Sequence, residues 1–350
     1  MTREPPPLAE VFARLIAATG PISLAHYMAE ANARYYGWRD PLGGAGDFVT
    51  APEISQMFGE LVGLWLTDLW TRAGRPDPVR YVELGPGRGT LARDALRAAR
   101  NFGLVPEVHF VETSPALVER QSALHPAARW HDGLAGVPID GPLLIVANEF
   151  LDALPIRQLV RTPTGWRERM IGLDGRRLVF VAGDRPMDAA VPAGLRDAPD
   201  GAILETCPAA AAIVAEVAGR LAGQGGAALF IDYGHDGSRL GSTFQAVRRH
   251  RPVDPLSDPG EADLTAHVDF ATLAAVAQAH GARWLGTVGQ GAFLRALGIE
   301  ERAGQLAAAA PAQADAIARA VARLTGEEAM GVLFKAMGLA APGWPAAAGF

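Results

Sequence analysis

The segment at residues 79–91, VRYVELGPGRGTL, decides the fold of this chain. It begins as a short apolar run that is typical of a buried strand, and Gly85, Gly87 and Gly89 follow it at once. Glycines between a strand and a helix let a ligand approach the backbone closely, and the N-terminus of the helix offers free N–H groups. The segment therefore predicts a nucleotide-binding turn.

The spacing of the glycines indicates which nucleotide the turn binds. A dinucleotide-binding turn needs a third glycine at the position of Thr90, and a Walker loop needs a lysine that is absent here. Instead the glycines alternate, and Glu83 stands two residues before the first of them. This arrangement resembles the first motif of class I S-adenosylmethionine-dependent methyltransferases. A nicotinamide-dependent oxidoreductase has the same kind of sheet and stays an alternative that the missing glycine disfavours.

Two acidic residues after later strands extend the predicted cofactor site. Glu112 follows an apolar run at 108–111 and lies 23 positions after Gly89, close to the spacing at which an acid reaches a ribose. A carboxylate only accepts hydrogen bonds, which suits the two ribose hydroxyls. Asp132 follows a weaker strand near Trp130 and either faces the adenine amino group or is only a turn residue. The glycine turn and Glu112 together predict S-adenosylmethionine as the cofactor.

A long glycine-rich loop at 37–55 precedes the turn in the sequence. Long ordered loops in compact domains often serve as lids or binding loops. Asp47, Phe48, Thr50 and Glu53 are therefore candidates for closing over the cofactor. The alternative is an ordinary surface loop with polar caps.

Predicted strands and helices alternate along the rest of the chain. This alternation implies an α/β fold with a parallel sheet, helices on both faces and a ligand crevice at the carboxyl ends of the strands. The later strands are predicted at 143–147, at 228–232, near Trp284 and at 332–334, and the helices at 8–36 with a break at Gly20-Pro21, 57–70, 91–99, 117–124, 208–221 and 270–280.

The domain organisation follows from these elements. Residues 1–75 are predicted to form a helical extension with the lid loop, and residues 76–350 a methyltransferase domain. Insertions are expected at about 157–200, with strands around a turn at Asp174, and at about 235–268, which reads as a loop rich in His and Asp.

The strand at 143–147 ends in a motif that predicts the methyl acceptor. Asn148 and Glu149 follow the strand, and Asp152 comes three residues later, so carboxylates stand at the rim of the crevice. Acids there favour a cationic acceptor, and arginine binds carboxylates through its forked guanidinium. The alternative is structural: Asp152 caps a helix and Glu149 pairs with an arginine. His267 is a candidate general base, with a structural histidine as its alternative.

The composition limits the class of protein and its partners. Hydrophobic residues make up 49% and charged residues 20%, which is typical of a globular enzyme. A net charge of −6 argues against a nucleic-acid partner. Cys207 is the only cysteine, and the histidines and acids fit no compact ligand motif, so neither a disulfide nor a metal site is predicted. No membrane-spanning run or signal peptide is evident, which predicts a cytoplasmic, bacterial protein.

Several motifs together resemble the MidA family of methyltransferases, relatives of the mitochondrial complex I assembly factor. These motifs are GPISLAHYM, GDFVTAPEISQMFGE, VELGPGRGTL, ANEFLDALP, IDYG, DPLSDPGEADLTAHVDF and GQGAFLRALGI. The resemblance implies a seven-stranded class I core with an N-terminal helical extension. It also implies symmetric dimethylation of arginine on the 49-kDa-type subunit of NADH dehydrogenase.

The family resemblance carries over to the residues already singled out. Glu83, the three glycines and Glu112 match the motifs for the cofactor, and residues 148–155 match the acceptor loop. A methyltransferase acting on a small molecule and a non-catalytic assembly chaperone stay open as alternatives. The oligomeric state, including a homodimer, is also open.

Overall fold

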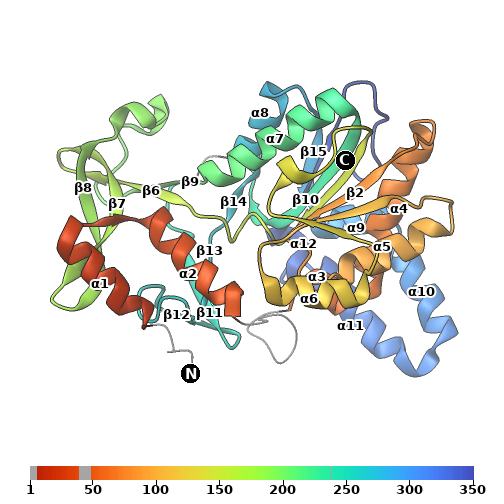
Figure 1. Cartoon of the computed structure of the whole chain (residues 1–350), viewed down its shortest axis with the longest axis horizontal. Helices are drawn as coiled ribbons and strands as arrows, with labels where there is room; N and C mark the ends of the chain where they lie inside the picture. Colours follow the sequence, from red (N-terminus) through yellow and green to blue (C-terminus); the bar gives the residue numbers. More distant parts are fainter. Residues whose placement is uncertain (1–5, 39–48, 238) are drawn as a thin grey trace. The chain divides into compact units, whose positions relative to one another are not determined.

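The computed structural model describes residues 6–38, 49–237 and 239–350 and divides the chain into two compact units (Figure 1). The small unit comprises Met1–Pro41, Asp152–Ala210 and Ser238–His267, and the large unit comprises Leu42–Leu151, Ala211–Gly237 and Val268–Phe350. The predicted boundary at residue 75, between a helical extension and a methyltransferase domain, differs from this division into units and stays a prediction.

The large unit is built on a sheet in which β2 (Arg80–Leu84) lies between β3 and β5. Strands β4, β3, β2, β5 and β10 lie side by side and run parallel, whereas β16 is antiparallel to both β10 and β15. The other bounds are β3 Glu107–Val111, β4 Arg129–His131, β5 Leu143–Asn148, β10 Gly226–His235, β14 Val268–Asp269, β15 Arg283–Gly289 and β16 Phe334–Ala340. The short β14 pairs with β10. The predicted α/β class is confirmed.

Helices cover both faces of this sheet, with α7 and α8 on one side and α4 and α5 on the other (Figure 1). Their bounds are α3 Ala51–Ile54, α4 Gln56–Arg72, α5 Thr90–Arg100, α6 Pro115–Leu124, α7 Pro208–Gln224, α8 Phe270–Ala279, α9 Gln290–Ala296, α10 Ile299–Ala309, α11 Ala314–Thr325 and α12 Met330–Leu333. Among the described residues, no helix combines the length and the apolar character needed to cross a membrane.

The apolar face of α4 packs closely on α5. Trp65 and Leu69, one turn apart, join Tyr81 and Val146 in the buried core. A Cβ atom on Gly63 would lie 2.2 Å from the carbonyl oxygen of Ala95, so only glycine allows the two helices to approach this closely. This packing fixes α5, the helix that begins at the glycine turn.

The small unit combines two helices with two sheets. One sheet has the order β1-β7-β6-β9 with β8 beside β7, and the other has the order β12-β11-β13. The bounds are α1 Leu8–Thr19, β1 Ile22–Ser23, α2 Leu24–Trp38, β6 Arg157–Thr162, β7 Gly165–Asp174, β8 Arg177–Pro186, β9 Ile203–Thr206, β11 Gln245–Arg248, β12 Arg251–Val253 and β13 Asp263–Thr265. The helix break at Gly20 and the turn after Asp174 are confirmed.

Two predictions of secondary structure are wrong. The segment 235–268, predicted as a loop, contains β11, β12 and β13, each only three or four residues long and therefore without a readable alternation. The strand predicted at 332–334 begins only at Phe334, because Val332 and Leu333 belong to α12. A three-residue apolar run does not distinguish a helix from a strand.

Candidate functional site

The glycine turn connects β2 to α5 as predicted. Gly85, Gly87 and Gly89 have φ angles of 62°, 55° and 77°, a region that side chains disfavour. A Cβ atom on Gly85 would lie 2.6 Å from the ring of Phe150. Both the backbone conformation and this ring therefore exclude a side chain at position 85. The turn therefore carries no side chain at these three positions, at the carboxyl end of β2.

Glu112, just beyond the end of β3, is held by hydrogen bonds from three donors. Its Oε1 accepts from the backbone N–H groups of Thr113 at 2.9 Å and Ser114 at 2.8 Å, and its Oε2 accepts from Gln121 Nε2 at 3.1 Å. Burial raises the pKa of the Glu112 carboxyl, and these hydrogen bonds act in the opposite direction. These bonds fix the side chain, and its oxygens can still accept a further hydrogen bond.

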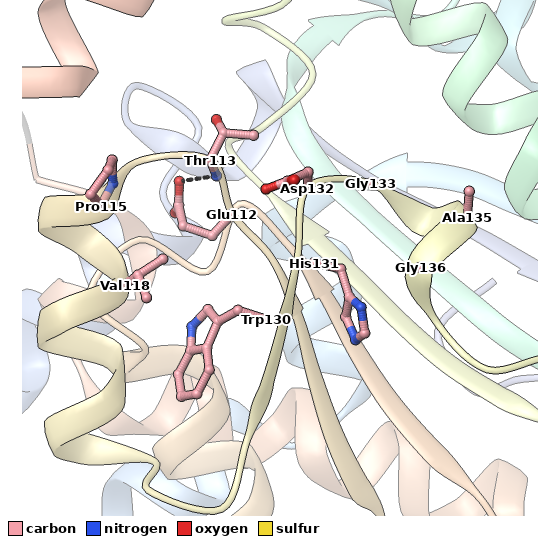
Figure 2. Close-up of a pocket in the computed structure, with 10 residues that line it drawn as sticks. All are labelled: Glu112, Thr113, Pro115, Val118, Trp130, His131, Asp132, Gly133, Ala135 and Gly136. Carbon is pink, nitrogen blue, oxygen red and sulfur yellow. Dashed lines mark hydrogen bonds between the residues drawn. The ribbon is translucent and has the colours of Figure 1, made fainter.

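A cavity of about 750 Å³ opens beside Glu112 (Figure 2). Its walls come from the ends of β3 and β4 and from the start of α6, and they include Thr113, Trp130, Asp132 and Gly133. Figure 2 shows the Asp132 carboxylate on the side of the cavity where Glu112 lies. The two predicted acids therefore border one cavity.

His131 also lines the cavity and is linked to a second, fully buried histidine. The distance between His131 Nε2 and His109 Nδ1 is 2.9 Å. Burial lowers the pKa of both imidazoles. The two imidazoles are therefore neutral near pH 7.

Asn148 and Glu149 lie at the end of β5, the strand next to β2. Glu149 Oε1 accepts from Ala51 N at 2.8 Å and from Asn148 Nδ2 at 3.1 Å. Glu149 has a φ of 50°, which is uncommon for a residue other than glycine and is often found at functional sites. Asn148 Oδ1 is buried, and no group in the described parts of the chain donates to it.

The buried Asp232, inside β10, holds the turn after Glu149. Its Oδ2 accepts from Phe150 N at 3.1 Å and from Leu151 N at 2.9 Å, and its Oδ1 accepts from Tyr233 N at 2.9 Å. Asp232 is not among the site residues that the sequence predicts. The available signal was its position in the IDYG motif, at the end of the strand predicted at 228–232.

The short helix α3 connects the acceptor motif to the glycine turn. Ala51 binds Glu149, and Glu53 accepts from Thr90 Oγ1 at 2.5 Å and lies 3.7 Å from Arg88 Nη1. Thr50 immediately precedes this helix, but its side chain makes no capping hydrogen bond. Of the other predicted lid residues, Asp47 and Phe48 lie outside the described residues.

Glu83 is directed into the core of the large unit. Its carboxyl is only 2% exposed and accepts from the Tyr81 hydroxyl at 2.6 Å. Burial raises its pKa to about 8, and the bond from Tyr81 opposes this shift. Glu83 is therefore buried and bonded to Tyr81 on the strand that carries the turn, and its role at the cofactor stays a prediction.

Asp152 and His267 belong to the small unit, and backbone contacts bring their segments together. The Asp152 carbonyl accepts from Ala266 N at 3.0 Å, and His267 N donates to Thr243 Oγ1 at 2.9 Å. No helix begins at Asp152, so its alternative interpretation as a helix cap is wrong. No group of three or more metal-binding side chains occurs within the ranges that the structure describes.

Comparisons with known proteins identify the family of this chain. A family model described as S-adenosyl-L-methionine-dependent methyltransferase matches residues 61–288. The mitochondrial protein arginine methyltransferase NDUFAF7 of Xenopus laevis is 39% identical over 323 residues, which cover 82% of this chain and 73% of the relative. The human protein of that name is 39% identical over 326 residues, covering 82% and 72% of the two chains.

A solved structure resembles the whole chain. It is a superfamily member from Burkholderia thailandensis bound to S-adenosylhomocysteine, with a TM-score of 0.80 and 28% sequence identity. The match covers 97% of this chain and 95% of that protein.

Proposed function

Because the chain belongs to this family of S-adenosyl-L-methionine-dependent methyltransferases, we propose that it methylates arginine side chains of a protein. The observation that carries the proposal is the pair at the end of β5, where the buried Asn148 Oδ1 has no donor among the described residues and adjoins the Glu149 carboxylate. Two adjacent acceptors suit a group that has only N–H donors, and the guanidinium is such a group. The names of the relatives support the same acceptor.

The residues of the large unit fit the cofactor. The bare turn at Gly85, Gly87 and Gly89 would accept its amino-acid end, and Glu112 would accept hydrogen bonds from the ribose hydroxyls. Asp132 at the same cavity would receive the adenine amino group. Glu83 would act indirectly, through the strand that carries the turn. When bound, S-adenosylmethionine supplies an electrophilic methyl group on a sulfonium sulfur.

Glu149 would orient the guanidinium and take up the proton that it loses on methylation. An arginine guanidinium is charged in proteins, so its lone pairs are delocalised and it is a poor nucleophile. A carboxylate fixed by Ala51 and Asn148 would localise the positive charge on the bound nitrogens and leave the remaining nitrogen more nucleophilic. Holding the reacting groups in this way contributes up to roughly 7–11 kcal/mol in favourable systems.

Asp152 and His267, which follow from the sequence motifs, are proposed as further residues that bind the methyl acceptor. Thr50 is proposed to lie over the cofactor, since the next residue, Ala51, is bonded to Glu149. The family resemblance leads us to propose a subunit of NADH dehydrogenase as the substrate. We also assign the sheet to the seven-stranded class I topology, since the reversed β16 lies between β10 and β15.

Mass spectrometry of a co-purified partner tests this function. The partner is purified with the wild-type protein and with Gly87→Val, in which a β-branched side chain meets a φ of 55°. We expect arginine methylation in the partner that disappears with the variant. Methylation of a small molecule alone contradicts the protein acceptor, and a partner that stays bound but is never methylated favours the assembly chaperone.

A further inference from the structure

Gln121 on α6 joins three parts of the large unit that are far apart in the sequence. Its Nε2 donates to the Gly87 carbonyl at 2.7 Å and to Glu112 Oε2 at 3.1 Å, and its Oε1 accepts from Trp130 Nε1 at 2.8 Å. Gln121 itself is completely buried. One amide thus contacts the glycine turn, the acid after β3 and a wall of the cavity.

The chemistry of the three partners requires an amide at this position. A carbonyl and a carboxylate only accept hydrogen bonds, whereas the indole N–H only donates. Gln121 provides two donors and an acceptor in the matching places, so the orientation of its amide is determined by its partners. A glutamate would lose both donors and bring a second carboxylate against Glu112, and a leucine would lose all three bonds.

We propose that Gln121 is a positioning residue for the cofactor, which couples the conformation of the glycine turn to the orientation of Glu112. The proposal rests on the cofactor site assigned above. Gln121 itself would not touch the ligand, because its polar atoms are occupied by Gly87, Glu112 and Trp130. A cofactor that binds the turn at one end and Glu112 at the other requires both in fixed positions at the same time.

Gln121 also affects the charge of Glu112. Its hydrogen bond is among those that lower the pKa of this half-buried carboxyl. Loss of the bond raises that pKa further, so protonation of Glu112 begins at a higher pH and weakens the acceptor for the ribose. A residue that only filled space in the core would not shift the pH dependence of cofactor binding.

Calorimetric titration with S-adenosylmethionine, repeated across pH, tests the proposal. For Gln121→Leu and Gln121→Glu we expect a dissociation constant about ten- to one-hundredfold higher, as for a lost hydrogen bond to a charged group. In Gln121→Leu, where His131 and Asp132 are unchanged, the acidic limit of binding should also move to higher pH. Glu119→Gln, an exposed position on α6, is the matched control and should bind like the wild type.

The outcomes separate this proposal from the proposed function. Wild-type affinity and pH dependence in folded Gln121 variants overturn the role of Gln121, whereas absence of binding by the wild type overturns the cofactor site itself. If both variants fail to fold, the side-chain amide resonances of Gln121 are followed in the wild type by NMR. They should shift on addition of S-adenosylmethionine, and unchanged resonances at saturation contradict the coupling.

Discussion

The backbone N–H of Ala51 donates a hydrogen bond of 2.8 Å to Glu149 Oε1, so the start of α3 is attached to the carboxylate at the end of β5. At the other end of α3, Glu53 accepts from Thr90 next to the glycine turn. The same short helix therefore contacts the proposed acceptor site and the proposed cofactor site.

Glu149→Gln separates the chemical step from cofactor binding. The amide keeps an oxygen that can accept from Ala51, but it lacks the charge that would orient a guanidinium and the basicity to take up a proton. We expect methyl transfer to fall by about 100-fold or more, the range of a lost general base. The dissociation constant for S-adenosylmethionine, measured by calorimetry, should stay within about threefold of the wild type. Near-normal turnover would remove Glu149 from the mechanism.

Gly85→Ala tests the close approach at the turn. The new Cβ atom has to occupy a left-handed backbone position and meets the Phe150 ring at 2.6 Å. The matched control is Gly103→Ala, which has a φ of 84° but no atom within 4 Å of the added Cβ. Both variants should lose about 1–2 kcal/mol in the free energy of unfolding from the left-handed backbone position, and the contact with Phe150 should add to the loss in Gly85→Ala. Only Gly85→Ala should also lose affinity for S-adenosylmethionine, and equal affinities in the two variants would count against the turn as its binding site.

Asp232→Asn tests whether Asp232 holds the turn that follows Glu149. The buried carboxylate accepts from three backbone N–H groups, and an amide can present its oxygen to only some of them. We expect the free energy of unfolding to fall by about 1–3 kcal/mol and the turnover number to fall with it, because Glu149 loses its fixed position. Denaturant titration and steady-state kinetics measure the two effects. Asp236→Asn, an exposed residue just after β10, is the control, and an equal loss in that variant would refute the specific role.

The pH dependence of stability should report on Glu83. Its pKa is about 8 in the folded protein and near 4.5 when it is unfolded, so only the folded state keeps the proton between these values. The stabilisation is complete at acidic pH and is lost as the pH rises through about 8. Glu83→Gln should flatten the thermal-unfolding profile between about pH 5 and 8 relative to the wild type. Glu112 contributes a slope of the same sign to both proteins, so identical profiles contradict the buried, protonated Glu83.

The parts of the site that the sequence predicts are those with a local signal. The glycine turn, Glu112 and the Asn148-Glu149 pair each follow an apolar strand, and the carboxyl ends of parallel strands meet at one edge of the sheet. Gln121 has no such signal, because a glutamine on a mixed helix normally faces solvent and its partner Gly87 lies 34 residues away.

Non-local contacts explain the other differences between sequence and structure. Asp232 accepts a hydrogen bond from the N–H of Phe150, which lies 82 residues away in the sequence. Strand β13 pairs with β11 across an intervening strand and turn. Such pairings are decided by tertiary packing, for which a single sequence carries no periodic pattern. Glu83 is buried on the same face of β2 as Tyr81, which donates a hydrogen bond to it. Both faces of this strand are buried, so an alternation of apolar and polar residues does not reveal the burial of Glu83.

Transfer of a tritiated methyl group to protein arginine is the most direct measurement. Wild-type protein and Glu149→Gln are incubated with the labelled cofactor and with extract from cells that lack this protein, and the protein fraction is hydrolysed to amino acids. We predict that the wild type places the label in methylarginine and that Glu149→Gln does so about 100-fold more slowly. Label found only in small molecules or in other amino acids, or equal labelling by the two proteins, would contradict arginine methylation at this site.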